Sequence, residues 1–153
     1  ATMMQPATTL TKEQALAWLD DCTNSELIEQ INLNLFRHLD YAPELAMHCI
    51  SSETINHKIA GYILALRISA NLPTDLQHGI TTKAIRDAEI DDISLANSIG
   101  ICLAKFCRKD ATSADEIFKS VQHFNNDNLN GKKLIYDSVK HELIFLGLLN
   151  ENF

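Results

Sequence analysis

The sequence has little of what a β-sheet protein or a nucleotide-binding loop needs. Glycine occurs only 5 times in 153 residues, and valine is rare, so strands are poorly supported. The chain has no glycine-rich phosphate loop and no Gly-x-Ser-x-Gly nucleophile motif. No apolar run approaches the roughly 20 residues that cross a bilayer, and the opening ATMMQPATTL lacks the segments of a secretory signal. We therefore expect no membrane contact and a cytoplasmic location.

Positive charge is also scarce. The chain has 13 Lys and Arg residues against 20 Asp and Glu residues, a formal net charge of -7. Proteins that bind DNA without sequence preference usually carry a basic patch, because phosphate neutralisation supplies most of the affinity. The balance argues against strong DNA binding and leaves room only for a local basic face.

The 4 cysteines and 6 histidines are not spaced as metal ligands are. None of the cysteines, Cys22, Cys49, Cys102 and Cys107, belongs to a Cys-x-x-Cys pair, and each lies in an apolar helical pattern. There a thiol packs as a small hydrophobic group, so we expect buried and reduced cysteines. No histidine has a His or Cys four residues away with a third ligand nearby. The sequence predicts no metal and no cofactor.

What the sequence does contain is a helical period along its whole length. Helix-starting patterns support it, since Thr11 with Gln14 and Thr23 with Glu26 match the capping box. The pattern predicts about eight helices, near residues 12–21, 25–39, 43–50, 53–70, 74–88, 93–108, 113–124 and 130–148.

Short breaks join these helices in pairs, most clearly at Leu72-Pro73-Thr74 and at residues 125–128. Each pair spans about 35–40 residues, near the size of a HEAT repeat. We therefore expect an all-α fold, a HEAT-like, right-handed αα-superhelix, or solenoid, over residues 11–153. Residues 1–10 are expected to form a flexible N-terminal tail.

Three residues carry specific packing expectations. Gly61 lies in the middle of an expected helix, where glycine costs up to about 1 kcal/mol relative to alanine. A close contact between two helices would explain it. Phe36 and Leu64 are expected in the core, on neighbouring helices.

Six stretches, taken in order, resemble one known family. They are Trp18-Leu19-Asp20-Asp21, Glu29-Gln30, Asn34-Leu35-Phe36, Lys58-Ile59-Ala60-Gly61, Asp91-Asp92 with the helix Leu95 to Phe106, and Leu134 to Lys140. The family is the DNA alkylation repair family, the AlkD-type HEAT-like DNA glycosylases. The resemblance covers nearly all of this chain but only the later two-thirds of a full member. It implies a concave face that binds DNA carrying a cationic alkylated purine, where an aspartate and two tryptophans line the cleft and an arginine contacts the DNA backbone.

The resemblance places the family's site residues on positions that have mostly lost their chemistry. The aspartate falls on Glu29, one methylene longer, and a misplacement near 1 Å can cost on the order of a hundredfold in rate. The two tryptophans fall on Ser25 and Ile101. The arginine and two lysines fall on residues without charge: Ile59, Ala96 and Asn97. Glu29 is therefore either a catalytic relic or a solvated carboxylate on an amphipathic helix.

Basic residues provide most candidates for binding DNA or a partner. Lys105, Arg108 and Lys109 cluster at the end of one expected helix, where the helix dipole also favours positive charge. Lys132 and Lys133 lie at the start of the last helix, where the dipole disfavours them, and are expected to extend this cluster. The full candidate set for DNA or partner binding is Ser25, Lys58, Lys105, Arg108, Lys109, Lys132 and Lys133.

The segment Leu143 to Leu149 is strongly apolar, so it either ends the last core helix or joins two copies in a homodimer. Three functions stay open. The first is a binding or scaffold module without efficient base excision. The second is an active glycosylase on alkylated purines that uses Glu29, and the third is an adaptor between proteins without a nucleic-acid role. Weak duplex DNA and a protein both stay open as partners.

Overall fold

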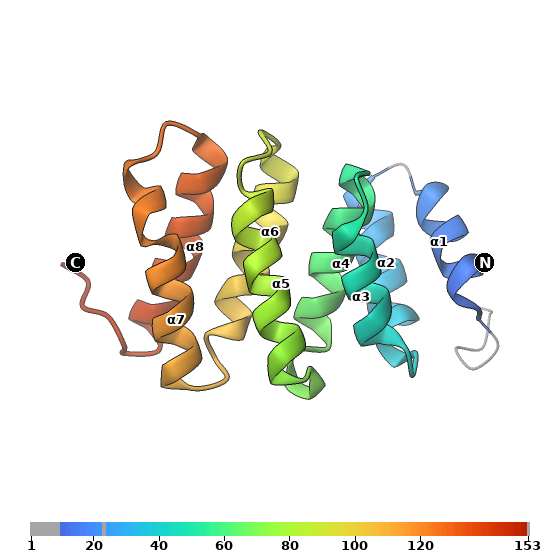
Figure 1. Ribbon diagram of the computed structural model, residues 1–153, viewed down its shortest axis with the longest axis horizontal. Coiled ribbons are helices and arrows are strands. Elements are labelled where there is room, and N and C mark those ends of the chain that lie inside the picture. The colour runs from blue at the N-terminus through green and yellow to red at the C-terminus, as the bar shows by residue number, and fades with distance from the viewer. Residues whose placement is uncertain (1–9, 23, 153) are drawn as a thin grey trace. The chain divides into compact units, whose positions relative to one another are not determined.

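The computed structural model describes residues 10–22 and 24–152, and for Ser25 only the backbone. This part of the chain contains eight α-helices and no strand, so the all-α prediction is confirmed (Figure 1). The chain divides into two compact units, Ala1–Leu72 and Pro73–Phe153. The division falls at the Leu72-Pro73 break that the sequence marks, and each unit is described by itself.

The first unit is built around one buried helix. Its α-helices are α1 (Lys12–Asp20), α2 (Ser25–Asn34), α3 (Ala42–Ser51) and α4 (Ile55–Arg67), with 3₁₀ turns η2 (Phe36–His38) and η3 (Ser69–Asn71). Helix α4 packs against α1, α2 and α3. All its residues from Ile59 to Ala65 are buried, as expected for a helix that is apolar all round.

Gly61 allows α4 to approach α3 closely. A Cβ atom at Gly61 would lie 2.6 Å from Ile50 Cγ1 and 2.8 Å from the Ala46 carbonyl oxygen. Only glycine fits such a contact with the neighbouring backbone, so the expected close helix contact is confirmed. Phe36 and Leu64 are each 1% exposed, which confirms their place in the core.

The start of the described chain is anchored to the first unit. Leu10 is 4% exposed, and its carbonyl accepts a 2.6 Å hydrogen bond from the Tyr41 hydroxyl. The capping box of Thr11 and Gln14 follows, with backbone-to-side-chain bonds of 2.9 and 3.2 Å. The expected flexible tail over residues 1–10 is therefore wrong at residue 10. Residues 1–9 lie outside the described residues.

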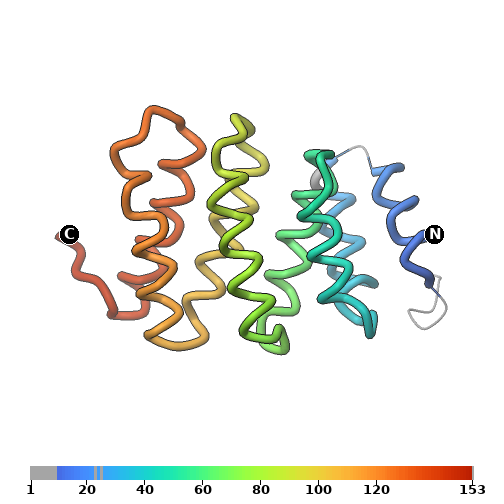
Figure 2. Tube along the Cα trace, viewed as in Figure 1, coloured from blue at the N-terminus to red at the C-terminus, as the bar shows by residue number. Residues whose placement is uncertain are grey.

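The second unit consists of two helical hairpins. Its described α-helices are α5 (Thr74–Asp87), α6 (Ile93–Phe106), α7 (Ala111–Val121) and α8 (Asn130–Phe145), and the 3₁₀ turn η4 (Gln122–Asn126) follows α7. Helix α6 packs against α5, α7 and α8, and α5 also contacts α7. Figure 2 shows the path of the chain from α5 to α8.

Helices α6 and α8 run parallel to each other. A Cβ atom at Gly131 would lie 3.0 Å from the Ala96 Cβ, near the start of both helices. Further along, a Cβ atom at Gly100 would lie 3.0 Å from the Ser138 Cβ. Two hairpins stacked with a parallel helix pair are typical of αα-repeats, while the superhelix over the whole chain stays a prediction.

Several expected helices end in a 3₁₀ turn instead of a final α-turn. The expected helices 25–39, 53–70 and 113–124 are α-helical only to Asn34, Arg67 and Val121. Apolar spacing does not separate the two helix types, because residues three apart share a face in both.

The caps of two helices also differ from expectation. Helix α2 is capped by the Asn24 side chain, which accepts a 3.0 Å bond from the Leu27 N–H. Thr23, the expected cap, lies outside the described residues. Helix α7 begins at Ala111, capped by Asp110, two residues before the expected start.

Candidate functional site

The residues that the sequence singles out divide between the two units. Ser25, Glu29 and Lys58 belong to α2 and α4 of the first unit. The other candidates belong to the second unit: Lys105, Arg108, Lys109, Lys132 and Lys133. The side chain of Ser25 lies outside the described part of the structure.

Glu29 lies on the solvent side of α2. It is exposed, while Ile28 and Ile31 on the same helix are buried. Within the described residues its carboxylate makes no hydrogen bond and no ion pair. A catalytic carboxylate must be held in position, and nothing among these residues holds Glu29. The arrangement favours the solvated carboxylate over the catalytic relic.

Lys58 is half-buried and contacts the end of a neighbouring helix. Its Nζ atom donates a 2.9 Å hydrogen bond to the Ile50 carbonyl in the last turn of α3. A lysine there satisfies a carbonyl that the helix itself leaves unpaired. The next residue, Ile59, matches the family's arginine and is 4% exposed. That position belongs to the core and does not face a ligand.

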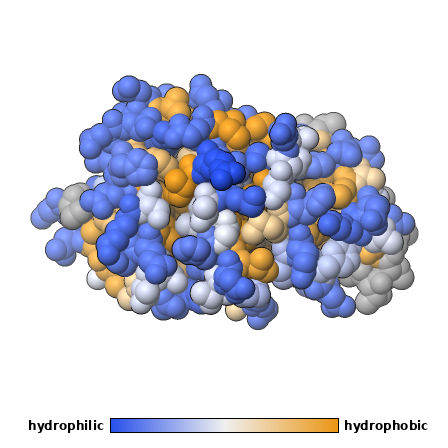
Figure 3. All heavy atoms as spheres, in the orientation of Figure 1, coloured by the Kyte–Doolittle hydropathy of each residue, from blue (hydrophilic) through white to orange (hydrophobic). Residues whose placement is uncertain are grey.

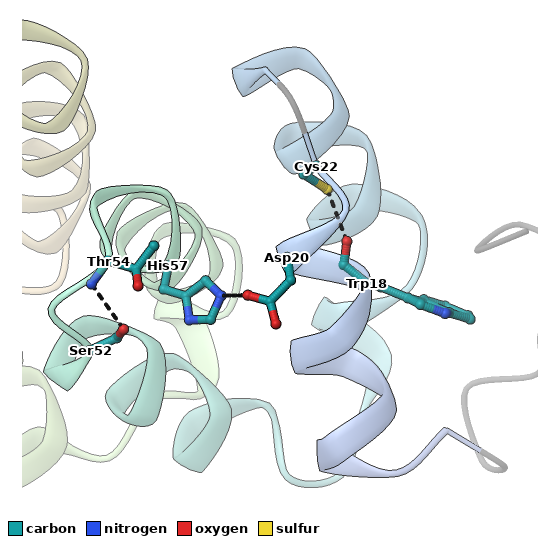
Figure 4. A network of polar contacts seen from close by, with 6 residues as sticks. All are labelled: Trp18, Asp20, Cys22, Ser52, Thr54 and His57. Carbon is teal, nitrogen blue, oxygen red and sulfur yellow. Dashed lines mark hydrogen bonds and ion pairs between the residues drawn. The ribbon is translucent and has the colours of Figure 1, made fainter.

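His57 joins α4 to α1, a contact that the sequence did not indicate. Its Nε2 atom lies 2.7 Å from Asp20 Oδ1, and Figure 4 shows the ring pointing at that carboxylate. The Trp18 indole points away from this pair in the same view. The two residues are 37 positions apart in the sequence, so no local pattern indicates the pair.

Lys132 is held by two carboxylates at the start of α8. Its Nζ atom lies 2.7 Å from Glu89 Oε1 and 2.9 Å from Asp127 Oδ2. The ammonium also lies 5.5 Å from the centre of the Phe124 ring, within reach of a cation–π contact. Glu89 and then Asp127 raise the pKa of Lys132. With two carboxylates on one ammonium, the cluster carries no net positive charge to offer a phosphate.

Asp127 has a further contact that explains why this lysine suits a helix start. The backbone N–H of Leu129 and then Lys132 lower the pKa of Asp127. The helix dipole disfavours a lysine in the first turn, and the adjacent carboxylates offset that effect.

Two of the three cations at the end of α6, Arg108 and Lys109, also have partners in the second unit. Arg108 forms an ion pair with Glu142 of α8, including an Nη2–Oε2 distance of 3.4 Å. Glu142 raises the pKa of Arg108 by its hydrogen bond and then by its charge. Lys109 donates a 2.5 Å bond to Thr74 Oγ1 at the start of α5. Lys105 is half-buried.

The two basic groups of the second unit lie at opposite ends of the α6–α8 pair. Gly131 at the start of α8 lies beside Ala96, whereas Arg108 lies beside Glu142 near its end. Ala96 and Arg108 are twelve residues apart, about 18 Å along a helix. The expectation that Lys132 and exposed Lys133 extend the other cluster is therefore wrong. The parallel direction of the two helices separates the groups, and no sequence pattern indicates that direction.

The remaining positions matched to the family are not arranged as a cationic cleft. Ala96 is 3% exposed and lies against α8, so it is a packing residue. Asn97 is exposed and Ile101 half-buried on the same helix. These residues offer neither charge nor an aromatic face to DNA.

Between α5 and α7 lies a groove of about 350 Å³ that the sequence analysis did not single out. Hydroxyl, amide and carboxylate side chains and the His78 imidazole line it, with Ile85 and Ile117 as apolar lining. Figure 3 shows a mainly hydrophilic surface over these helices, with hydrophobic atoms between. The available signal was spacing: Thr74, Gln77 and Thr81 recur at helical intervals on one face.

The cysteines are inert packing residues. All four are free and buried, which confirms the expectation. Burial raises the pKa of the thiols of Cys49 and Cys107 to about 12, so the reactive thiolate is nearly absent at neutral pH. Across the described residues, no group of three or more His, Cys, Asp or Glu side chains could hold a metal ion. No helix there is long and apolar enough to span a membrane.

Comparison with known proteins adds no relative. No family model, no curated protein and no solved structure matches the chain. Fold and contacts define a class only: an all-α protein of paired helices, in which Arg108, Lys119 and Lys132 form ion pairs with carboxylates of the chain itself. The likeness to the AlkD-type family rests on the sequence pattern alone.

Proposed function

We propose that this chain is a HEAT-like helical binding module that resembles AlkD-type DNA alkylation repair proteins but lacks efficient base excision. We further propose that its partner is a protein and that duplex DNA binds weakly at most. One observation carries the proposal: Arg108 and Lys132 are paired with the module's own carboxylates. Because paired cations release few counterions from DNA, they add little affinity for phosphates.

The absence of excision follows from the side chains at the matched positions. Ser25 and Ile101 replace two indoles, each of which supplies about 0.5–2 kcal/mol of cation–π attraction to a cationic purine. Together that is roughly 1–4 kcal/mol, or about five- to a thousandfold in rate. Glu29 adds a positioning loss, because its carboxylate is exposed and unpaired within the described residues.

An excision assay tests this part of the proposal. An oligonucleotide with N7- or N3-alkylated purines is incubated with stoichiometric protein, and abasic sites are detected by strand cleavage. We expect purine release at the spontaneous rate, in the wild type and in the matched Glu29→Gln variant. Release by the wild type that disappears in Glu29→Gln would restore the glycosylase function.

Two further proposals concern assembly and location. Phe145 is 79% exposed and Leu148 49% exposed, so the apolar C-terminal segment Leu143–Leu149 is our proposed contact between two copies. The four free, buried thiols support a reducing and therefore cytoplasmic location.

A further inference from the structure

The groove between α5 and α7 presents hydroxyl oxygens whose protons are already used. Thr81 donates to the Gln77 carbonyl at 2.9 Å, and Thr82 donates to the His78 carbonyl at 3.1 Å. On α7, Ser120 donates to the Glu116 carbonyl at 2.9 Å. A hydroxyl that donates to its own helix keeps its lone pairs. These three side chains therefore meet a ligand as acceptors.

Gln77 adds a side-chain amide to the groove wall. It lines the groove and is only 5% exposed, yet its carboxamide makes no hydrogen bond with any residue that the structure describes. Because Gln77 lines the groove, this amide is free to hydrogen-bond with water or with an occupant of the groove.

Charge and size narrow the chemistry of that occupant. Glu116 places a carboxylate on the groove wall, which repels anions and favours cations. Lys109 already donates to the Thr74 hydroxyl at one end of the groove, so one hydroxyl of this wall accepts from a cation. Thr81 lies about 10 Å further along α5. At that distance salt largely screens the positive charge of Lys109, so the lysine repels a cation near Thr81 only weakly. The groove's volume of about 350 Å³ is small for a ligand site and suits one long side chain.

We infer that the α5–α7 groove binds the guanidinium group of an arginine side chain on the protein partner. Arginine has five N–H donors, no acceptor and a permanent charge, which matches an acceptor-rich wall with one carboxylate. Its aliphatic stem would cover Ile85 and Ile117. A phosphate would meet lone pairs and a carboxylate instead of donors. This inference rests on the proposed protein partner.

The test is an NMR titration of the whole chain with N-acetyl-arginine amide. We expect shifts at the backbone amides of Gln77, Thr81, Thr82 and Ser120, and at the Gln77 side-chain amide. N-acetyl-citrulline amide has nearly the same shape without the charge and should bind at least about fivefold more weakly. Equal binding of the two compounds, or no shifts in the groove, would overturn the inference.

Matched variants distinguish binding in the groove from a general effect of the protein's negative charge. Glu116→Gln should weaken arginine-amide binding about two- to fivefold, as expected for an exposed charge pair. Asp115→Asn makes the same change at the next residue of α7, which lines a different pocket, and should leave binding unchanged. Thr82→Val keeps the shape of an exposed residue, removes one acceptor and should also weaken binding. Thermal melts verify that all three variants are folded, and equal effects of Glu116→Gln and Asp115→Asn would contradict the assignment.

A last comparison separates a protein partner from a free small molecule. A peptide with one arginine between glycines should bind more tightly than free arginine, because flanking backbone adds contacts. Tighter binding of free arginine would overturn the assignment to a protein. Affinity for duplex DNA is measured separately. Strong DNA binding together with arginine binding in the groove would refute the proposed function but not the arginine site.

Discussion

Asn32 is a buried polar residue whose side chain is only half satisfied. It is fully buried in α2, and its Nδ2 atom donates to the carbonyls of Ile28 at 3.1 Å and Ala60 at 3.3 Å. Its Oδ1 atom has no hydrogen-bond partner among the described residues. Both carbonyls lie inside α-helices, where a backbone N–H already bonds each of them.

Replacing Asn32 tests whether this amide stabilises the fold. Asn32→Leu keeps a similar volume and removes the unpaired oxygen, so the free energy of unfolding should be unchanged or about 1 kcal/mol higher. Asn32→Asp places a charge beside two carbonyl oxygens and should cost at least about 2 kcal/mol at neutral pH. Urea unfolding followed by circular dichroism measures both. A loss above about 1 kcal/mol in Asn32→Leu would show that the amide is needed.

Sequence patterns find residue types at this scale but not their partners. The unfavourable position of Lys132 in a first turn was visible in the sequence. Its counter-ion Glu89 lies in another loop, at a separation that no local pattern encodes. Glu29 was found from the resemblance, and Gln77 was missed because a single glutamine on a helix carries no burial signal. Whether any of these residues binds a partner stays a prediction.

At the scale of elements, the contact between α3 and α4 depends on Gly61. Gly61→Ala would gain about 1 kcal/mol in helix propensity. The added Cβ would lie 2.8 Å from both the Ala46 oxygen and the Ile50 nitrogen, which are backbone atoms. Overpacking of this kind costs about 1–3 kcal/mol or more when the neighbours cannot move. We expect a net loss of about 1–3 kcal/mol in the free energy of unfolding, measured in urea.

Gly131→Ala is the matched control for this contact. Its added Cβ would meet only the Ala96 Cβ, at 3.0 Å, which a small helix shift relieves. We expect a clearly smaller loss than for Gly61→Ala. An equal or greater loss in Gly131→Ala would mean that the α3–α4 contact is not specially tight.

The cap of α7 makes part of the stability dependent on pH. Asp110 accepts a 2.7 Å bond from the Ser113 N–H, which is the main reason why its pKa is lowered. The bond therefore stabilises the fold above the ordinary range of an aspartate, near pH 3.9, and is lost as pH falls through the lower folded value. Asp110→Ala should lower Tm at neutral pH, and this difference should shrink on acidification below about pH 4.

Asp110→Asn is the control for the titration, because asparagine caps helices without a charge. Its Tm should stay near that of the wild type at neutral pH. Melts followed by circular dichroism at several pH values provide the comparison. A Tm difference between wild type and Asp110→Ala that stays constant down to strongly acidic pH would refute the role of the ionised cap.

The helices were predictable as elements, but their ends and directions were not. Their existence follows from apolar spacing and from caps such as Thr11 and Asp92. The end of α2 depends on Leu35, whose φ of -132° leaves the helical region, although leucine is a good helix former. The parallel direction of α6 and α8 goes with close contacts of Gly100 and Gly131 across the helix pair. Such contacts join residues far apart in the sequence, so the periodic pattern of apolar residues does not indicate them.

At the scale of the whole molecule, the exposed C-terminal apolar segment predicts self-association. Phe145 lies at the end of α8 and Leu148 follows the turn at Gly147, and both are largely exposed. We expect a concentration-dependent dimer of the wild type in light scattering, and a monomer for Phe145→Ser. Lys133→Ser, an exposed change at the other end of α8, should leave the dimer intact. A wild type that stays monomeric at high concentration would contradict this contact.

The proposal of a protein partner over DNA rests on charge. The formal net charge is -7, and two of the candidate cations are paired with carboxylates of the second unit. Each phosphate contact to DNA needs a cation that can exchange water and counterions for the backbone. With Arg108 and Lys132 paired in this way, the module is proposed to bind a protein surface in preference to a duplex.

Affinity for plain duplex DNA, measured by fluorescence anisotropy over a series of salt concentrations, tests this account most directly. At physiological salt we predict a Kd no tighter than the roughly 10⁻⁴–10⁻⁶ M of non-specific contacts, with a shallow dependence on salt. A nanomolar Kd with a steep salt slope would show that the cations are free to contact phosphates, and would contradict the proposed protein-binding module.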